Sequence, residues 1–377
     1  MKTSLLAVVF AGVFLPHVVV AAAPAPGFQQ LYSFTAGDGG NPLPTLTFSN
    51  GVLFGTTQSG GAGGNGTLFS FDPATGVETV LHVFNGMDGN RPAAPVVVSG
   101  GALYGTTASG GTDNLGTAFK LDLVTGALTT LHSFHGSDGA GPGSALLFHS
   151  GAFYGATHAG GATNTGTFYK MNPRTGDVTV IHSFGNPDGR QPSGDLVYVA
   201  GAFYGAATYG GQAQHGMIFK VDAATGVESV AYTLGVNSPT ARDGFYPLVG
   251  LTHAEGGLIG STTSGGDFGL GTMFKIALPS GTTTVLHSFA GGQDQFPAAG
   301  LVSLGSRVYG VTPGNFTNSD GTVFQLARAD GSEKLLHAFG SESYYSPTCL
   351  VAAGSVLYGA TTYGGANGNG TIFKLTP

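Results

Sequence analysis

Apolar and polar residues alternate along short segments of this chain, and turn residues separate the segments. In one stretch the alternating segments are residues 94–98, 102–107, 117–122 and 127–134. Runs of β-branched, aromatic and small apolar residues with a period of two predict β-strands. Nothing in this stretch has the longer apolar period of a helix, so the pattern predicts an all-β fold.

This unit of four segments recurs along the chain. Leu103-Tyr104-Gly105-Thr106-Thr107 has close counterparts elsewhere, and its glycine returns at spacings of 50, 50, 50, 55, 50 and 49 residues. The seven glycines are Gly55, Gly105, Gly155, Gly205, Gly260, Gly310 and Gly359. Four antiparallel strands in a repeat of roughly 50 residues are typical of one propeller blade. The sequence therefore predicts a seven-bladed β-propeller.

The two ends of the chain carry complementary parts of a repeat. Leu31-Tyr32-Ser33-Phe34 matches Leu131-His132-Ser133-Phe134, which belongs to a fourth segment, and no other part of a repeat precedes it. Residues 370–375 match a third segment, and no fourth follows. We expect the N-terminal strand to complete the last blade, because a closed ring leaves no terminal sheet edge exposed to aggregation.

The first residues resemble a targeting segment rather than part of a blade. Lys2 is followed by an apolar run from Leu5 to Val20 and then by three alanines. One positive charge, a short apolar run and small residues predict a secretory signal peptide over residues 1–22, leaving residues 23–377 as the propeller. We therefore expect a secreted protein, extracellular or periplasmic, with no transmembrane segment in the mature chain.

Composition excludes some partners. The net charge is −7 and only 9% of residues are charged, so no basic stripe is available to neutralise phosphates, and we expect no nucleic acid partner. The single cysteine, Cys349, rules out an internal disulfide and lies in an apolar stretch, so we expect it to be buried. We predict a monomer without a cofactor.

Several motifs together resemble a known family. They are Leu-Tyr-Gly-Thr-Thr, a glycine pair, Gly-Thr-x-Phe-Lys-Leu, Thr-Gly and Leu-His-Ser-Phe, as at residues 103–107, 110–111, 116–121, 125–126 and 131–134. The set is similar to the GloVer tandem repeat of bacterial exported proteins, a kelch-like propeller, over essentially the whole mature chain. The resemblance implies a role at the cell envelope or outside the cell and implies no particular reaction.

Two recurring polar residues suggest a scaffold role. Histidines occupy one position of the fourth strand in five repeats, namely His82, His132, His182, His287 and His337. Equivalent residues on the outer strands of different blades lie far apart, whereas metal ligands must converge, so we expect hydrogen bonds and predict no metal site. An aspartate recurs in the loops between blades, as at Asp88, and we expect it to cap its own loop backbone.

Candidate binding residues are sought where the repeat is broken. Loops after the second strand and loops between blades should open on one face of the ring, and loops on a rigid scaffold often carry binding residues. The candidates on this face are Arg190, Asp195, Tyr209, Arg242, Tyr246 and Tyr344. Arg242 and Tyr246 lie in an expanded loop, and adjacent blades would bring them near Arg190.

Two functional classes remain open. The first is a non-catalytic binding module for a glycan or another envelope component, because tyrosine faces stack on sugar rings and arginine forms forked hydrogen bonds. The second is an enzyme acting on polysaccharide, for instance a lyase with a tyrosine or histidine base and an arginine at the uronate. A glycosidase would need a convergent carboxylate pair, and Asp195 has no obvious partner in the sequence. No catalytic residue is assigned.

Overall fold

The computed structural model describes residues 27–42, 46–235, 242–248, 250–254, 256–291, 296–297, 300–313, 321–340 and 346–377. The expected leader, residues 1–22, lies outside these ranges. Within them the chain forms strands and turns and no helix, so no helix crosses a membrane in the described part. The all-β prediction is confirmed.

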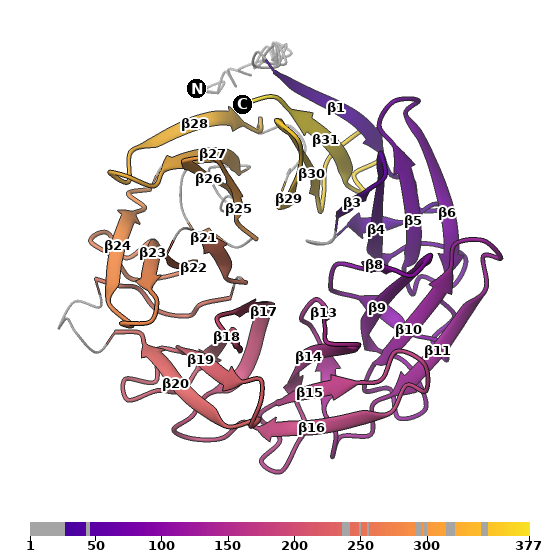
Figure 1. The fold of residues 1–377 in the computed structure, drawn as a ribbon. Helices are drawn as coiled ribbons and strands as arrows, with labels where there is room; N and C mark the ends of the chain where they lie inside the picture. Colours follow the sequence, from indigo (N-terminus) through magenta and orange to yellow (C-terminus); the bar gives the residue numbers. More distant parts are fainter. Residues whose placement is uncertain are drawn as a thin grey trace, which may run out of the picture.

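The strands form seven antiparallel sheets arranged as blades around a central opening (Figure 1). Blade 1 contains β2 (Gly40–Pro42), β3 (Thr47–Ser49), β4 (Val52–Ser59), β5 (Thr67–Asp72) and β6 (Val77–Val83). Blade 2 contains β7 (Asn90–Pro92), β8 (Val97–Ser99), β9 (Ala102–Ser109), β10 (Thr117–Asp122) and β11 (Leu128–Ser133). Blade 3 contains β12 (Ala140–Pro142), β13 (Leu147–His149), β14 (Ala152–Ala159), β15 (Thr167–Met171) and β16 (Val178–Ser183). In these blades two short segments share the innermost position, so each sheet is four strands wide.

The next three blades have one innermost strand each. Blade 4 contains β17 (Arg190–Val199), β18 (Ala202–Tyr209), β19 (Met217–Asp222) and β20 (Glu228–Thr233). Blade 5 contains β21 (Thr252–Ala254), β22 (Gly257–Thr262), β23 (Thr272–Ala277) and β24 (Thr283–Ser288). Blade 6 contains β25 (Val302–Leu304), β26 (Arg307–Thr312), β27 (Thr322–Ala327) and β28 (Glu333–Ala338).

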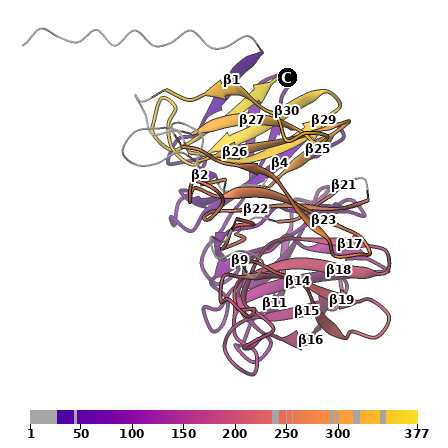
Figure 2. The ribbon, with the colours of Figure 1, turned by 90° about the vertical axis from the view of Figure 1, so that its left-hand side faces the viewer.

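Blade 7 closes the ring with strands from both ends of the chain. It contains β29 (Pro347–Ala353), β30 (Val356–Thr361), β31 (Thr371–Leu375) and, outermost, β1 (Phe28–Ser33). β1 pairs antiparallel with β31, from Phe28 opposite Leu375 to Ser33 opposite Thr371. β1 and the C-terminus lie side by side in both views (Figure 1, Figure 2). The predicted closure through the N-terminal strand is confirmed.

The repeated glycine of the second strand is required by packing. A Cβ atom on Gly105 would lie 2.6 Å from Cζ of Phe119, and one on Gly205 would lie 2.3 Å from Cζ of Phe219. The third-strand aromatic ring therefore lies across the glycine of its own blade. Phe119 and Phe219 are fully buried in clusters that combine residues of adjacent blades, so the core lies both within and between the sheets.

A buried threonine pair joins the second and third strands in six blades and is replaced in blade 4. In blade 2, for example, Thr107 Oγ1 lies 2.9 Å from Thr117 Oγ1, and Thr117 Oγ1 donates to Asp88 O at 3.0 Å. In blade 4 the same register pairs Ala207 with Met217. Blade 4 thus departs from the repeat in its core as well as in its loops.

Candidate functional site

Arg190 and Tyr209 are brought together by strand register. Arg190 begins β17, Tyr209 ends β18, and the two residues pair directly. Antiparallel connectivity places the loop after the second strand and the loop between blades on the same face, so both side chains stand at that face. The Arg190 guanidinium carbon lies 5.8 Å from the centroid of the Tyr209 ring, a cation–π distance.

Tyr246 joins this pair from the next blade. Its ring meets the Tyr209 ring edge to face, with 5.4 Å between centroids. The Tyr246 backbone N donates to His215 O at 2.8 Å, which ties the loop entering blade 5 to the loop between β18 and β19. Arg190 Nη2 also donates to Gln214 Oε1 at 3.2 Å. We call Arg190, Tyr209, Gln214 and Tyr246 the blade-4 cluster.

The positive charge of Arg190 has no anionic partner within the part of the chain that the structure describes. Among the residues that the structure describes, Arg190 forms no ion pair, and its polar partner is the uncharged amide of Gln214. Arg242 is different, because its Nε lies 3.5 Å from Asp267 Oδ1. Arg242 also lines a separate cavity of about 450 Å³ with Phe268 and the outer strand β24. Of the two residues expected near Arg190, Tyr246 belongs to the cluster, whereas Arg242 lines another cavity.

Two further candidates are placed elsewhere. Asp195 lies in the middle of β17 rather than in a loop, and its side chain lines the central channel instead of the cluster. The sequence suggested that Arg190 and Asp195 flank one loop between blades, whereas in the structure both belong to β17, and Asp195 lies in a bulge of this strand between Ser193 and Val197. Tyr344 lies outside the described residues.

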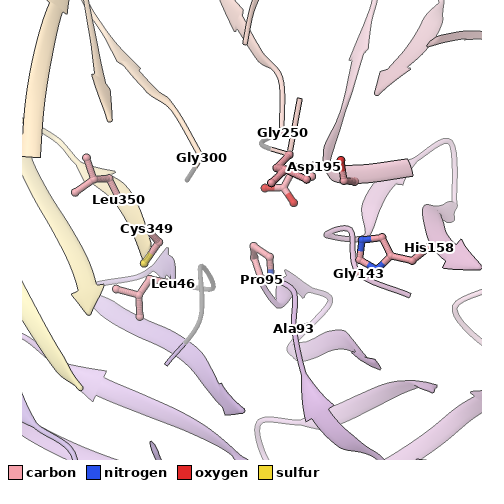
Figure 3. A pocket seen from close by; sticks show the side chains of 13 residues that line it. Leu46, Ala93, Pro95, Gly143, His158, Asp195, Gly250, Gly300, Cys349 and Leu350 are labelled. Carbon is pink, nitrogen blue, oxygen red and sulfur yellow. The ribbon is translucent and has the colours of Figure 1, made fainter. Parts of the chain in front are cut away.

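The central channel holds a cavity of about 280 Å³. Figure 3 shows the Asp195 carboxylate and the His158 imidazole on one side of it, with Leu46, Cys349 and Leu350 on the other. Burial raises the pKa of Asp195, although Ala145 N donates to Oδ1 at 3.1 Å. Desolvation by the channel walls lowers the pKa of His158, although the residue is exposed to the channel. Cys349 is buried, as expected.

The repeated histidines bind the repeated aspartates. Nε2 of His82, His132 and His182 lies 2.9, 2.7 and 2.8 Å from Oδ2 of Asp88, Asp138 and Asp188, respectively. The other oxygen of each aspartate accepts a backbone N–H of its own loop, as Asp188 Oδ1 does from Gly185 N at 2.8 Å. The predicted hydrogen bonding of the histidines and loop capping by the aspartates are confirmed in these three blades.

Glutamates modify this arrangement at some junctions between blades. Glu78, on the outer strand of blade 1, stands near Tyr32 and Asp38 of the preceding junction, and burial together with the charge of Asp38 raises its pKa to about 7. Glu228 stands near His182 and Asp188 in the same way, and burial and the charge of Asp188 raise its pKa to about 7.

Sequence reasoning did not find Gln214 or Glu228. Gln214 stands where Asn114 and Asn164 recur, and those asparagines use Oδ1 to accept Gly110 N and Gly160 N. The longer Gln214 side chain reaches Arg190 and Asn186 instead. The replacement of a recurring asparagine by glutamine was therefore visible in the sequence. Glu228 gave a weaker signal, because glutamate also occurs at the equivalent positions of blades 1 and 6.

Comparison with solved structures finds chains with a similar fold. An oligogalacturonate lyase solved in complex with manganese matches with a TM-score of 0.59 at 11% identity, covering 94% of this chain and 95% of that one. A chain of the mitotic checkpoint complex matches with a TM-score of 0.57 at 11% identity, covering 100% of this chain and 99% of that one. At such identities the likeness concerns the fold alone.

Sequence comparison identifies the repeat. None of the curated proteins matches this chain in sequence. The model of the Gloeobacter/Verrucomicrobia repeat matches residues 49–267 and 232–377, which together span most of the chain and all seven repeated glycines. The resemblance seen in the Leu-Tyr-Gly-Thr-Thr and Leu-His-Ser-Phe motifs is thereby confirmed. The chain belongs to the Gloeobacter/Verrucomicrobia repeat family.

Proposed function

We propose that this protein is an exported, non-catalytic binding module that recognises an acidic glycan of the envelope or its surroundings through the blade-4 cluster. The observation that carries the proposal is Arg190, a cation without an ion pair among the described residues, held 5.8 Å from the face of Tyr209. A uronate carboxylate would supply the missing negative charge, and it matches the forked geometry of a guanidinium.

The aromatic residues of the cluster suit the sugar part of such a ligand. Tyr209 is 36% exposed, so part of its ring remains available for stacking. Tyr246 meets it edge to face and Phe245 meets Tyr246 in the same way at 5.2 Å, which restricts the orientation of both tyrosines. Rigid aromatic surfaces bind with little loss of side-chain entropy. The cluster therefore combines one cation, one amide and a held aromatic surface.

The proposal is tested with two matched ligands. Isothermal titration of the purified mature protein should show binding of oligogalacturonate and much weaker binding of its methyl ester, which keeps the sugar rings and removes the charge. Replacement of Arg190 by Gln should weaken oligogalacturonate binding by roughly tenfold or more, as expected for a charged hydrogen bond of about 1.5 kcal/mol or more.

A control variant separates the cluster from net charge. Arg174→Gln removes the same charge from the exposed turn between β15 and β16, on the opposite face of the ring, and should leave affinity unchanged. Equal affinity of wild type and Arg190→Gln for oligogalacturonate, or equal binding of the ester and the acid, would refute the proposed site.

A lyase acting on the same class of polymer is the second candidate. The observation that favours it is the proximity of a phenol, Tyr209, to the guanidinium of Arg190, which forms no ion pair with the residues that the structure describes. A lyase needs a base close to a group that neutralises the uronate. Cleavage would produce an unsaturated uronate with a new ultraviolet absorbance. Its appearance with wild type, and its loss in Tyr209→Phe, would assign the protein to this class.

A further inference from the structure

Three metal-binding side chains meet at the junction between blades 3 and 4. His182 belongs to β16, Asp188 to the loop that leaves it, and Glu228 is the first residue of β20 in the next blade. One donor atom of each residue lies within 4.8 Å of the others. His182 Nε2 and Asp188 Oδ2, 2.8 Å apart, already face each other. Residues 46 positions apart are thus gathered around one point.

Comparison with the preceding junctions shows what is particular here. His82–Asp88 and His132–Asp138 repeat the first two members of the set. At the position of Glu228, however, the following blades carry Leu128 and Val178, which offer no ligand. A His–Asp pair alone therefore serves at those two junctions. The junction of blades 3 and 4 adds a third donor, and at the junction of blades 5 and 6 the equivalent Glu333 lies 3.0 Å from His287 Nε2.

The Glu228 carboxylate has one oxygen without a donor in the described ranges. Glu228 Oε1 is buried and has no hydrogen-bond partner among the described residues. A buried carboxylate oxygen without a donor destabilises the folded state, because it has lost its water and gained nothing in return. A cation at the centre of the three donors would provide the missing interaction.

We propose that His182, Asp188 and Glu228 bind a divalent transition-metal ion such as Zn²⁺. Imidazole nitrogen and carboxylate oxygen are both zinc ligands, and three protein ligands leave the fourth position of the tetrahedron for water. The ion takes the place of the proton shared by His182 Nε2 and Asp188 Oδ2, and this proton is released to solvent. Ligands at zinc bonding distance in a tetrahedron are roughly 3.3 Å apart, so the two atoms need to separate only slightly.

The environment of the ligands favours such a site. Asp188 Oδ1 accepts Gly185 N at 2.8 Å, which fixes the carboxylate while Oδ2 faces the imidazole. Hydrogen bonds of this kind orient ligands around a metal. The ion would join the outer strands of blades 3 and 4. Because Asp188 is two residues from Arg190, it would also hold the loop that carries the blade-4 cluster, a consequence that rests on the proposed function.

The site is tested by metal binding to untagged protein that has been stripped with a chelator. Titration with Zn²⁺, followed by measurement of the bound metal after gel filtration, gives the number of ions held by wild type and by Glu228→Leu. The variant reproduces the His–Asp–Leu combination of the first junction and should hold one ion fewer. Zn²⁺ should raise the melting temperature of wild type more than that of the variant.

A matched control uses another glutamate of the same strand position. Glu78→Leu changes a junction where Tyr32 replaces the histidine, and it should bind as many ions as wild type. The proposal is overturned if stripped wild type holds no Zn²⁺, or if Glu228→Leu holds as many ions as wild type. These readouts use no glycan, so failure of the metal site and failure of the proposed glycan site are distinguished.

Discussion

Phe28 closes the ring against blade 6, and its replacement by alanine should lower stability in a way that depends on pH. Its ring stacks on His337 with 3.7 Å between centroids and an angle of 5°, and it meets Phe339 edge to face at 5.6 Å. Truncation of a fully buried phenylalanine costs about 3–5 kcal/mol, so the half-buried Phe28 should contribute about 2 kcal/mol at neutral pH.

The pH dependence comes from His337. Burial lowers the pKa of this imidazole to about 4 from an ordinary value of 6.5. A depressed pKa stabilises the folded state above pH 6.5, and the stabilisation is lost as pH falls towards 4. Phe28→Ala would expose the imidazole to water and return its pKa towards 6.5. The variant should therefore lose less stability on acidification than wild type does.

The assay is equilibrium unfolding in urea at about pH 7.5 and about pH 4.5. After allowance for solvent screening of the partly exposed His337, the free energies of unfolding of wild type and variant should differ by about 2 kcal/mol at the higher pH and by about 1 kcal/mol at the lower pH. An equal difference in free energy of unfolding at both pH values would contradict this account of His337. No difference at either pH would show that Phe28 does not stabilise the closed ring.

Two other substitutions test the packing of the repeat. Glu78→Gln should be more stable than wild type by roughly 1 kcal/mol at about pH 8, because a pKa raised to about 7 means that ionisation of Glu78 opposes folding above that pH. The difference in stability should vanish near pH 4.5. A variant that is less stable than wild type at the higher pH would show that ionised Glu78 is favourable. Gly105→Ala should lower the free energy of unfolding by about 1–3 kcal/mol, because the new methyl group would collide with Phe119. In the control Gly340→Ala the methyl group meets no atom within 4 Å, so thermal unfolding should not change. Equal melting temperatures for the two variants would contradict the close contact at Gly105.

The sequence was sufficient for the architecture because each blade repeats the same local rules. The glycine at position 105 and its equivalents recur because an aromatic ring lies across each one, and such a constraint is visible whenever it is repeated. The complementary ends of the chain likewise indicated the pairing of β1 with β31.

The site was less predictable, because it depends on side-chain direction within single blades. Arg190 and Asp195 belong to one strand, yet one stands at the face with Tyr209 and the other lines the channel. The direction of each side chain depends on the alternation along β17 and on the bulge between Ser193 and Val197. Glycine and proline in the sequence indicate where a loop begins, but they do not indicate these directions. Gln214 required a comparison with Asn114 and Asn164, where one extra methylene changes the partner.

The pairing of β1 with β31 also sets an order of events during synthesis. β1 is translated long before β31, so residues 28–33 have no partner strand until residues 371–375 have left the ribosome. Until then the edge of β1 and the apolar rings of Phe28 and Phe34 are open to wrong pairing. Blade 7 is therefore the last sheet of the ring that can form, and β1 stays unpaired while the strands of the other six blades are made.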